Sequence, residues 1–152
     1  MEFYFRRRTK ADIQEFLSWH FEGVYAFYNN DSQQEKIDWY INSVENENAF
    51  SVFNEKEELI GNCEYSLDDG AYVMGLQMKP ELTGRGMGKV FSNAVIEFGR
   101  AKYQFSELYL AVAAFNERAV TVYGSLGFTV IEETIWTIRE KDYEFLIMKK
   151  QF

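Results

Sequence analysis

The fold of this chain is decided by the stretch Leu82-Thr83-Gly84-Arg85-Gly86-Met87-Gly88-Lys89, which joins an apolar strand-like segment to a long helix-patterned one. Glycine lacks the Cβ that would keep an anion away from the backbone, and a helix N-terminus offers unpaired N–H groups with a partial positive charge. Strand, glycine turn and helix in this order predict a phosphate-binding turn. A tight connection without a ligand is the simpler alternative.

Two common phosphate fingerprints do not match this turn. The dinucleotide pattern G-x-G-x-x-G fails, because Gly84 and Gly86 are followed by Lys89 where a third glycine should stand. The pattern G-x-x-x-x-G-K-[ST] of nucleotide P-loops fails at both ends, at Thr83 and at Val90. A nucleotide-binding domain is therefore a weaker hypothesis for this turn. It would require ATP or NAD to compete with the ligand that the turn binds.

The composition indicates a globular domain with its own core. The 152 residues are 47% hydrophobic and 18% aromatic, which suits one domain spanning residues 1–152. A net charge of -8 argues against a general nucleic-acid binder and is compatible with a cationic substrate. Cys63 is the only cysteine, so no internal disulfide or cysteine-based metal site is expected. With no signal-peptide pattern or long apolar run, we expect a cytoplasmic protein without a membrane partner.

Hydrophobic periodicity predicts a mixed α/β fold with the order β-α-α-β-β-β-α-β-α-β-β. The short connections between residues 49 and 78 favour an antiparallel meander, and the later strand–helix–strand unit favours one parallel crossover. The expected strands cover residues 3–5, 49–53, 59–66, 71–78, 107–114, 128–137 and 143–149, and the expected helices begin after Thr9 and Ser32 and cover residues 87–101 and 116–125.

Three local signals accompany the first two helices. Thr9 with Asp12, and Ser32 with Glu35, form capping-box patterns at the expected helix starts. The basic run 6–8 ends the first strand, and we interpret it as a solvated strand end. Between the helices, the aperiodic stretch 19–28 is rich in aromatic residues, which either line a binding cleft or plug the core beneath the loop.

The glycine turn resembles the acetyl-CoA-binding turn of the GNAT N-acetyltransferases, whose pattern is Gln/Arg-x-x-Gly-x-Gly/Ala after an apolar strand. Gly86 and Gly88 match the two small positions, whereas Thr83 departs from the Gln or Arg. A second segment, Asn116-x-Arg118-Ala119-x-x-x-Tyr123-x-x-x-Gly127-Phe128, is similar to the family's asparagine–tyrosine helix and following Gly-Phe. The two motifs together imply a GNAT-like fold and acetyl-CoA as co-substrate, with no metal.

The resemblance implies where acetyl-CoA is held. The turn amides would bind the pyrophosphate, helped by the helix dipole and by nearby positive charge. Strand backbone before the turn would meet the pantetheine amides, as an added strand does. The expected cofactor-binding residues are Leu76, Met78, Thr83, Gly84, Arg85, Gly86, Met87, Gly88, Lys89, Asn116 and Tyr123.

The resemblance also implies a general acid. Asn116 and Tyr123 lie on one helical face, and in the family the tyrosine sits near the thioester sulfur. Amine attack on a thioester expels a thiolate, and a phenol of pKa about 10 can protonate a thiolate whose conjugate thiol has a pKa of about 8.5. Two residues are the main candidates for the base that deprotonates the amine. They are Tyr72, at the position where some relatives carry a glutamate, and Glu64. Asp68 and Glu22 are further candidates.

The resulting hypothesis is direct acetyl transfer to a primary amine of an unidentified acceptor, more plausibly a small molecule than a protein. By resemblance, the acceptor would meet the loop 19–28, with Trp19, Phe21, Glu22 and Tyr25, and the turn 139–142. Cys63 lies away from both motifs, which disfavours a covalent enzyme intermediate. A non-catalytic CoA-binding regulatory or scaffold domain is the alternative. A homodimer is possible through pairing of the apolar strand 145–148.

Overall fold

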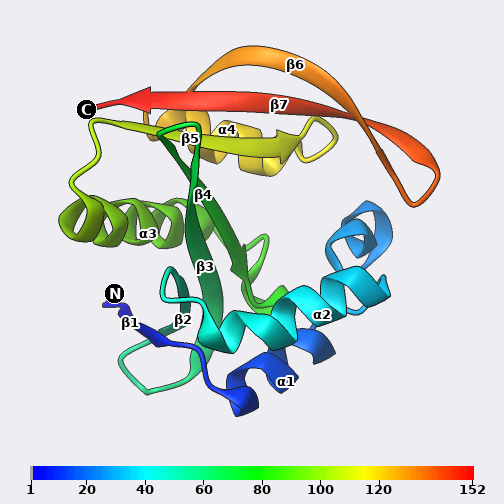
Figure 1. Ribbon diagram of the computed structural model, residues 1–152, viewed down its shortest axis with the longest axis vertical. Helices are drawn as coiled ribbons and strands as arrows, with labels where there is room; N and C mark the ends of the chain where they lie inside the picture. Colours follow the sequence, from blue (N-terminus) through cyan, green and yellow to red (C-terminus); the bar gives the residue numbers. More distant parts are fainter. Residues whose placement is uncertain (1) are drawn as a thin grey trace. The chain divides into compact units, whose positions relative to one another are not determined.

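A computed structural model describes residues 2–152, whose strands form a sheet in the order β1-β2-β3-β4-β5-β7-β6 (Figure 1). The chain divides into two compact units. The first runs to Glu64 and adds Leu76–Met87, and the second consists of Tyr65–Gly75 and Gly88–Phe152. Strands β3 and β4 each contribute to both units. The mixed α/β fold class and the predicted element order are confirmed.

The first unit contains an antiparallel sheet, in which β2 pairs with β1 and with β3. Helices α1 and α2 pack against each other (Figure 1). Its apolar cluster consists of Ile13, Phe16, Trp19, Tyr40 and Leu59. The elements are β1 (Tyr4–Arg7), α1 (Lys10–Ser18), η1 (Gly23–Tyr28), α2 (Gln34–Asn42), η2 (Ser43–Glu45), β2 (Ala49–Phe53), β3 (Leu59–Asp68), β4 (Ala71–Met78) and η3 (Pro80–Leu82).

Local sequence signals predicted one of the two helix starts. The capping box at α1 is confirmed, because Thr9 Oγ1 accepts from the Asp12 N–H and Asp12 Oδ2 accepts from the Thr9 N–H, both at 3.1 Å. The box predicted at Ser32 is wrong: α2 begins one residue later, with Gln33 as N-cap and no side-chain capping bond. The solvated reading of the basic run is wrong for Arg8, which is 3% exposed.

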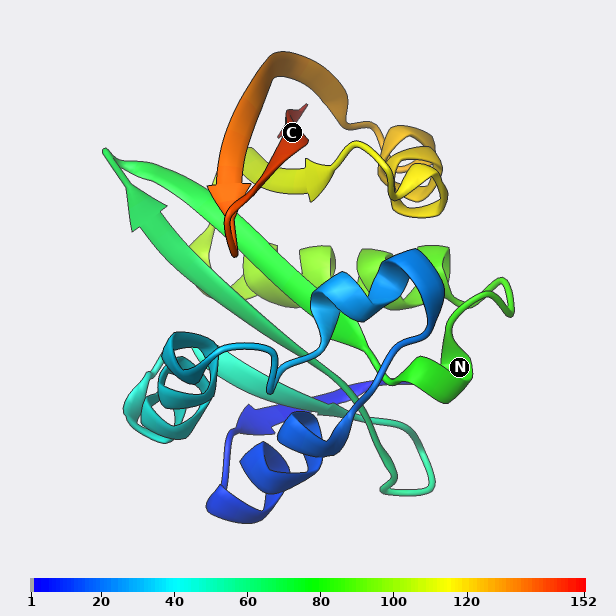
Figure 2. The ribbon, with the colours of Figure 1, turned by 90° about the vertical axis from the view of Figure 1, so that its right-hand side faces the viewer.

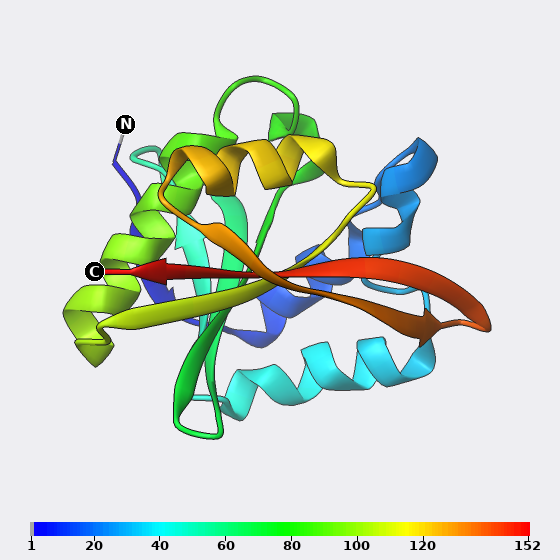
Figure 3. The ribbon, with the colours of Figure 1, turned by 90° about the horizontal axis from the view of Figure 1, so that it is seen from above.

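The second unit contains the parallel crossover that the sequence predicts. Val73 of β4 pairs in parallel with Tyr109 of β5. Strand β7 pairs antiparallel with β5 on one side and with β6 on the other, and α4 runs alongside these strands (Figure 3). The elements after β4 are α3 (Gly88–Tyr103), β5 (Glu107–Ala113), α4 (Glu117–Ser125), β6 (Thr129–Ile138) and β7 (Lys141–Gln151).

The position of β7 contradicts the suggested dimer pairing through residues 145–148. These four residues are paired with β5 at one edge and with β6 at the other, so β7 offers no open edge to a second chain. The tight β6–β7 turn explains this arrangement: Arg139 and Glu140 both adopt positive φ, 51° and 65°, which matches the twist that a two-residue hairpin needs.

Close packing of α3 on β3 depends on Gly99. A Cβ at this position would lie 2.8 Å from Tyr65 Cζ, and the Tyr65 ring is 2% exposed with its hydroxyl bonded to the Val95 carbonyl. The ring therefore cannot swing aside. We expect Gly99→Ala to lower the free energy of unfolding by about 1–3 kcal/mol, measured by urea denaturation.

Gly124 provides the matched control for this prediction. It also lies in a helix, α4, but a Cβ there meets no atom within 4 Å. Gly124→Ala should leave stability unchanged or raise it by up to about 1 kcal/mol, because alanine is the better helix former. Equal stability of the two variants would show that Tyr65 does not constrain α3.

Candidate functional site

The glycine turn is an open backbone loop that leads from η3 to α3 (Figures 2 and 3). Gly84 and Gly86 adopt left-handed φ values of 72° and 76°, on either side of Arg85. A Cβ at Gly86 would meet no protein atom within 4 Å. Left-handed residues within a turn direct neighbouring N–H groups into a shared concavity, a common anion-binding arrangement. The turn therefore fits a phosphate group through its backbone.

Three of the predicted cofactor residues, Leu76, Met78 and Thr83, lie before the glycines of the turn. Leu76 and Met78 are half-buried residues of β4, and the strand ends where the Lys79 N–H donates to the Ile60 carbonyl at 2.8 Å. Thr83 Oγ1 donates to the Pro80 carbonyl at 2.7 Å, which closes η3. At the position where the family pattern has Gln or Arg, Thr83 therefore stabilises the end of η3.

The two motifs meet inside the second unit. Gly88, the last glycine of the turn, starts α3, and a Cβ there would lie 3.6 Å from Val122 Cγ2 of α4. This is the helix that carries Tyr123, one residue further on. A small residue at position 88 thus lets the helix of the second motif pack at the start of α3.

Asn116 begins α4 and fixes where this helix starts. Its Oδ1 accepts from the Ala119 N–H at 3.2 Å, so it satisfies a donor that the helix leaves unpaired. The Tyr123 ring is half-buried and packs edge-on against Phe128 with 6.0 Å between ring centroids. Packing on Phe128 holds the phenol in place, while the exposed part of the side chain remains accessible.

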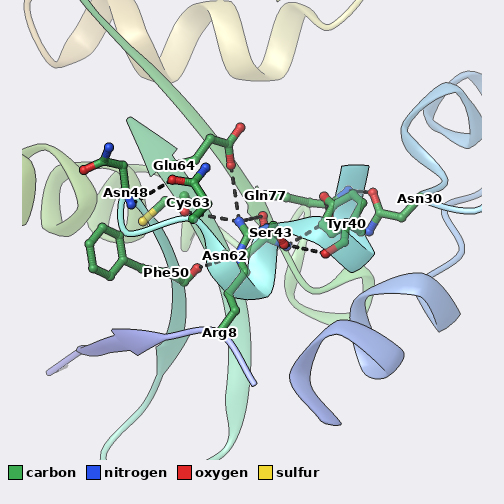
Figure 4. A network of polar contacts seen from close by, with 11 residues as sticks. Arg8, Asn30, Tyr40, Ser43, Asn48, Phe50, Asn62, Cys63, Glu64 and Gln77 are labelled. Carbon is green, nitrogen blue, oxygen red and sulfur yellow. Dashed lines mark hydrogen bonds and ion pairs between the residues drawn. The ribbon is translucent and has the colours of Figure 1, made fainter. Parts of the chain in front are cut away.

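The two candidate bases have different surroundings. Tyr72 packs among aromatic rings, with centroids 5.2 Å from Tyr103 and 5.6 Å from Phe105. Glu64 forms an ion pair with Arg8, with 3.3 Å between Oε2 and Nη2 (Figure 4). The Arg8 side chain is fully buried, whereas 29% of the Glu64 side chain is exposed. Glu64 is therefore a carboxylate that the buried Arg8 holds in place and that keeps part of its surface accessible to solvent.

Arg8 is the centre of a buried polar network that sequence reasoning missed (Figure 4). Its guanidinium donates to the Phe50 carbonyl at 3.3 Å and to Ser43 Oγ at 3.1 Å. It also donates to the Cys63 carbonyl at 3.2 Å, besides the Glu64 carboxylate. A buried cation is costly unless it is paired and hydrogen-bonded, and Arg8 meets both conditions.

Burial sets the acid–base properties of this network. It raises the pKa of Glu64 above its ordinary value, and the Arg8 guanidinium opposes this shift only in part. Burial and the charge of Glu64 also raise the pKa of Tyr40 well above the ordinary tyrosine value, so Tyr40 stays neutral. The network therefore pairs the buried Arg8 cation with the Glu64 carboxylate at its more exposed end, and Tyr40 beside them stays neutral.

A second part of the same network links the loop before α2 to strand β4 (Figure 4). Asn30 is 0% exposed, and its Nδ2 donates to Gln77 Oε1 at 2.8 Å. Gln77 Nε2 donates back to Asn30 Oδ1 at 3.2 Å. Asn62 Nδ2 also donates to Gln77 Oε1, at 3.3 Å, which connects this amide pair to β3.

The predicted acceptor residues divide between core and surface. Trp19 is 4% exposed in the apolar cluster, which agrees with the core-plug alternative and not with a cleft lining. Phe21 is half-buried against the same cluster, and Tyr25 is half-buried in η1. Glu22 is exposed and precedes η1. Only the last three present any surface to a ligand.

One sequence signal could have revealed the network. Asn62 and Gln77 are polar residues inside apolar strand segments, and a buried polar group requires a hydrogen-bonding partner.

Among residues 2–152, no group of three or more His, Cys, Asp or Glu side chains is placed to hold a metal ion. Over the same residues, no helix has the length and apolar character to span a membrane.

Comparison with known proteins places this geometry in a family. The model of the acetyltransferase (GNAT) family matches residues 11–128, which include both motifs. A chimera of the spermidine N-acetyltransferase SpeG from Vibrio cholerae and hSSAT is 18% identical, with a TM-score of 0.81 over 99% of this chain and 96% of that one.

A second solved structure is similar over nearly the whole of both chains. The spermidine N-acetyltransferase from Vibrio cholerae in complex with CoA and spermine is 18% identical, with a TM-score of 0.72 over 98% of this chain and 95% of that one. At such identities the likeness shows the fold alone. No curated protein sequence matches the chain. The family match, together with the glycine turn and the asparagine–tyrosine helix, shows that the chain belongs to the GNAT acetyltransferase family and is an acetyl-CoA-dependent N-acetyltransferase.

Proposed function

We propose that this enzyme transfers the acetyl group of acetyl-CoA directly to a primary amine of a small cationic molecule, with a linear polyamine as the first candidate. The observation that carries the proposal is the meeting of both motifs at the start of α3, where Gly88 faces α4. The net charge of -8 favours a cationic acceptor. The solved relatives are described as spermidine N-acetyltransferases, one of them with bound spermine, which supports the choice of a polyamine.

The turn residues would hold the co-substrate. The backbone amides of residues 84–88 would bind the pyrophosphate, because the three glycines have no Cβ to obstruct an anion. The exposed Arg85 and Lys89 add positive charge. Bound acetyl-CoA supplies an activated thioester carbonyl. Strand β4 at Leu76 and Met78 would pair with the amide groups of the pantetheine arm.

Two side chains would move protons. Tyr123 would donate its phenolic proton to the departing thiolate. Glu64 would accept a proton from the amine, directly or through a water, since an alkylammonium has a pKa of about 10.4 and must be deprotonated before attack. Burial favours this role, because it raises the pKa of Glu64 toward the operating pH while Arg8 keeps the carboxylate in place.

This assignment predicts a distinctive pH profile. A protonated Glu64 cannot act as a base, so kcat/KM for the amine should fall as the pH is lowered through its pKa. Because burial raises this pKa, the acid limb should lie above pH 4.5, the ordinary glutamate value. We expect Glu64→Gln to lower kcat/KM by about 10²-fold and to abolish this limb.

The other candidate base supplies the control. Tyr72→Phe removes only a hydroxyl from an aromatic cluster, and the acid limb should persist in this variant. Steady-state kinetics of both variants between pH 4 and 9 would decide between them. An unchanged limb in Glu64→Gln together with a lost limb in Tyr72→Phe would assign the base to the tyrosine.

A panel of amines tests the proposed function. Free thiol would be measured with acetyl-CoA and spermidine, spermine, a short monoamine, an aminoglycoside or a lysine-containing peptide. The highest kcat/KM is expected for the polyamines, because several positive charges match an acidic protein. A preference for the peptide would contradict the proposal. Binding of CoA without thiol release from any amine would favour a non-catalytic CoA-binding domain.

A further inference from the structure

We propose that Asn30 and Gln77 are positioning residues that hold the loop 19–33 against strand β4 and thereby set the affinity for the acceptor amine. This inference rests on the proposed function, with β4 at acetyl-CoA, and on the expectation from the family resemblance that the loop 19–28 meets the acceptor. Neither residue belongs to the motifs of the family pattern. Their role follows from the geometry of the buried network in the first unit (Figure 4).

The two side chains form a reciprocal amide pair. Asn30 donates to Gln77 at 2.8 Å and Gln77 donates to Asn30 at 3.2 Å, so each amide is both donor and acceptor toward the other. Such a pair fixes the orientation of both groups, because reversing one amide places two donors and two acceptors face to face. An acid in either position cannot reproduce it while ionised.

The other hydrogen bonds of the pair reach three other elements, α1, α2 and β3, and a further carbonyl of the loop. Asn30 Nδ2 donates to the Phe16 carbonyl at 2.7 Å near the end of α1, and Gln77 Nε2 donates to the Tyr28 carbonyl at 3.2 Å. Gln77 Oε1 accepts from Tyr40 Oη at 3.4 Å and from Asn62 Nδ2 at 3.3 Å. One glutamine thus joins the loop, α2 and β3 to β4.

The loop is anchored at its start by Trp19, which is 4% exposed in the apolar cluster. Helix η1 contains no buried residue, and Val24 within it is 64% exposed, so apolar burial contributes little to its position. Lys36 adds two partly buried bonds, because its Nζ donates to the Tyr28 and Asn29 carbonyls, each at 3.2 Å. Asn30, with 0% exposure, is a buried polar anchor near the other end of the loop.

The position of Gln77 in β4 explains why the effect should be confined to the acceptor. Side chains alternate along a strand, so Gln77 points to the face opposite that of its neighbours Leu76 and Met78. Replacing its side chain leaves the backbone of β4 and the glycine turn in place. The amine KM should therefore change while the acetyl-CoA KM does not.

The experiment compares Gln77→Glu with Gln14→Glu, which makes the same chemical change at an exposed position of α1. For Gln77→Glu we expect at least a tenfold rise in the KM for spermidine and less than a twofold change in the KM for acetyl-CoA. Amine-independent hydrolysis of acetyl-CoA should also stay within twofold. As the pH is lowered, the variant-to-parent KM ratio should fall, because a protonated Glu regains a donor.

Hydrogen exchange makes the test independent of the acceptor chosen. Amides of residues 19–33 should exchange at least tenfold faster in Gln77→Glu than in the parent, and those of residues 84–103 should be unchanged. Gln77→Met and Asn30→Asp repeat both readouts should Gln77→Glu fail to fold. Unchanged exchange, or an equal rise in both KM values, would overturn the inference. A parent enzyme without activity on any amine would contradict the proposed function instead. The hydrogen-exchange result would still test whether Asn30 and Gln77 hold the loop 19–33 in place.

Discussion

Tyr123→Phe is expected to lower kcat by about 10²-fold while the KM for acetyl-CoA changes less than threefold. The substitution removes the proton that the phenol gives to the thiolate and retains the ring. Its packing on Phe128 should persist, because the contact is made by the ring and not by the hydroxyl. Thiol release at saturating acetyl-CoA and amine would measure the effect.

The leaving group supplies a sharp internal check on this role. A thioester whose thiol has a lower pKa needs less protonation, so the deficit of Tyr123→Phe should shrink with such acyl donors. Tyr4→Phe, at a tyrosine that is 52% exposed in β1, should match the parent. A kcat within threefold of the parent for Tyr123→Phe would assign the tyrosine to packing alone.

Gly86→Ala is expected to raise the KM for acetyl-CoA by about 10- to 100-fold. Loss of one hydrogen bond to a charged group costs roughly 1.5–3 kcal/mol, and 1.4 kcal/mol is tenfold in affinity. A Cβ at Gly86 meets no protein atom within 4 Å, so any obstruction it causes is to a ligand in the turn. The amine KM should stay unchanged.

Gly70 is the matched control for this variant. It lies in the β3–β4 turn with φ +82°, against +76° for Gly86, and a Cβ there also meets nothing within 4 Å. Both alanine variants should lose about 1–2 kcal/mol of stability from the left-handed backbone. Only Gly86→Ala should raise the KM for acetyl-CoA. An equal KM in the two variants would remove the turn from the cofactor site.

The parts of the site that depend on neighbouring residues could be predicted from the sequence. Thr9 capping α1 and Asn116 capping α4 are contacts over three residues, and the glycine turn needs only its own backbone. The parallel crossover followed from the strand–helix–strand order. These features are specified within a few residues of where they occur.

The buried polar network of the first unit could not be predicted, because its partners are far apart in the sequence. Arg8 meets Glu64 only when β1 and β3 lie on either side of β2, and Asn30 meets Gln77 only when the loop packs on β4. Read locally, Arg8 belongs to a run of three arginines that is typical of a solvated strand end. Its burial is decided by tertiary packing, which a local pattern does not record.

The most direct test of the account is the stoichiometry of the reaction with spermidine. The enzyme would be supplied with acetyl-CoA and spermidine, and free thiol and acetylated amine would be quantified in the same samples by colorimetry and mass spectrometry. We predict one acetylated amine for each thiol released, and no acetyl group on the protein. Thiol release without acetylated spermidine, or acetyl-enzyme that forms before the amine is added, would contradict direct transfer to an amine.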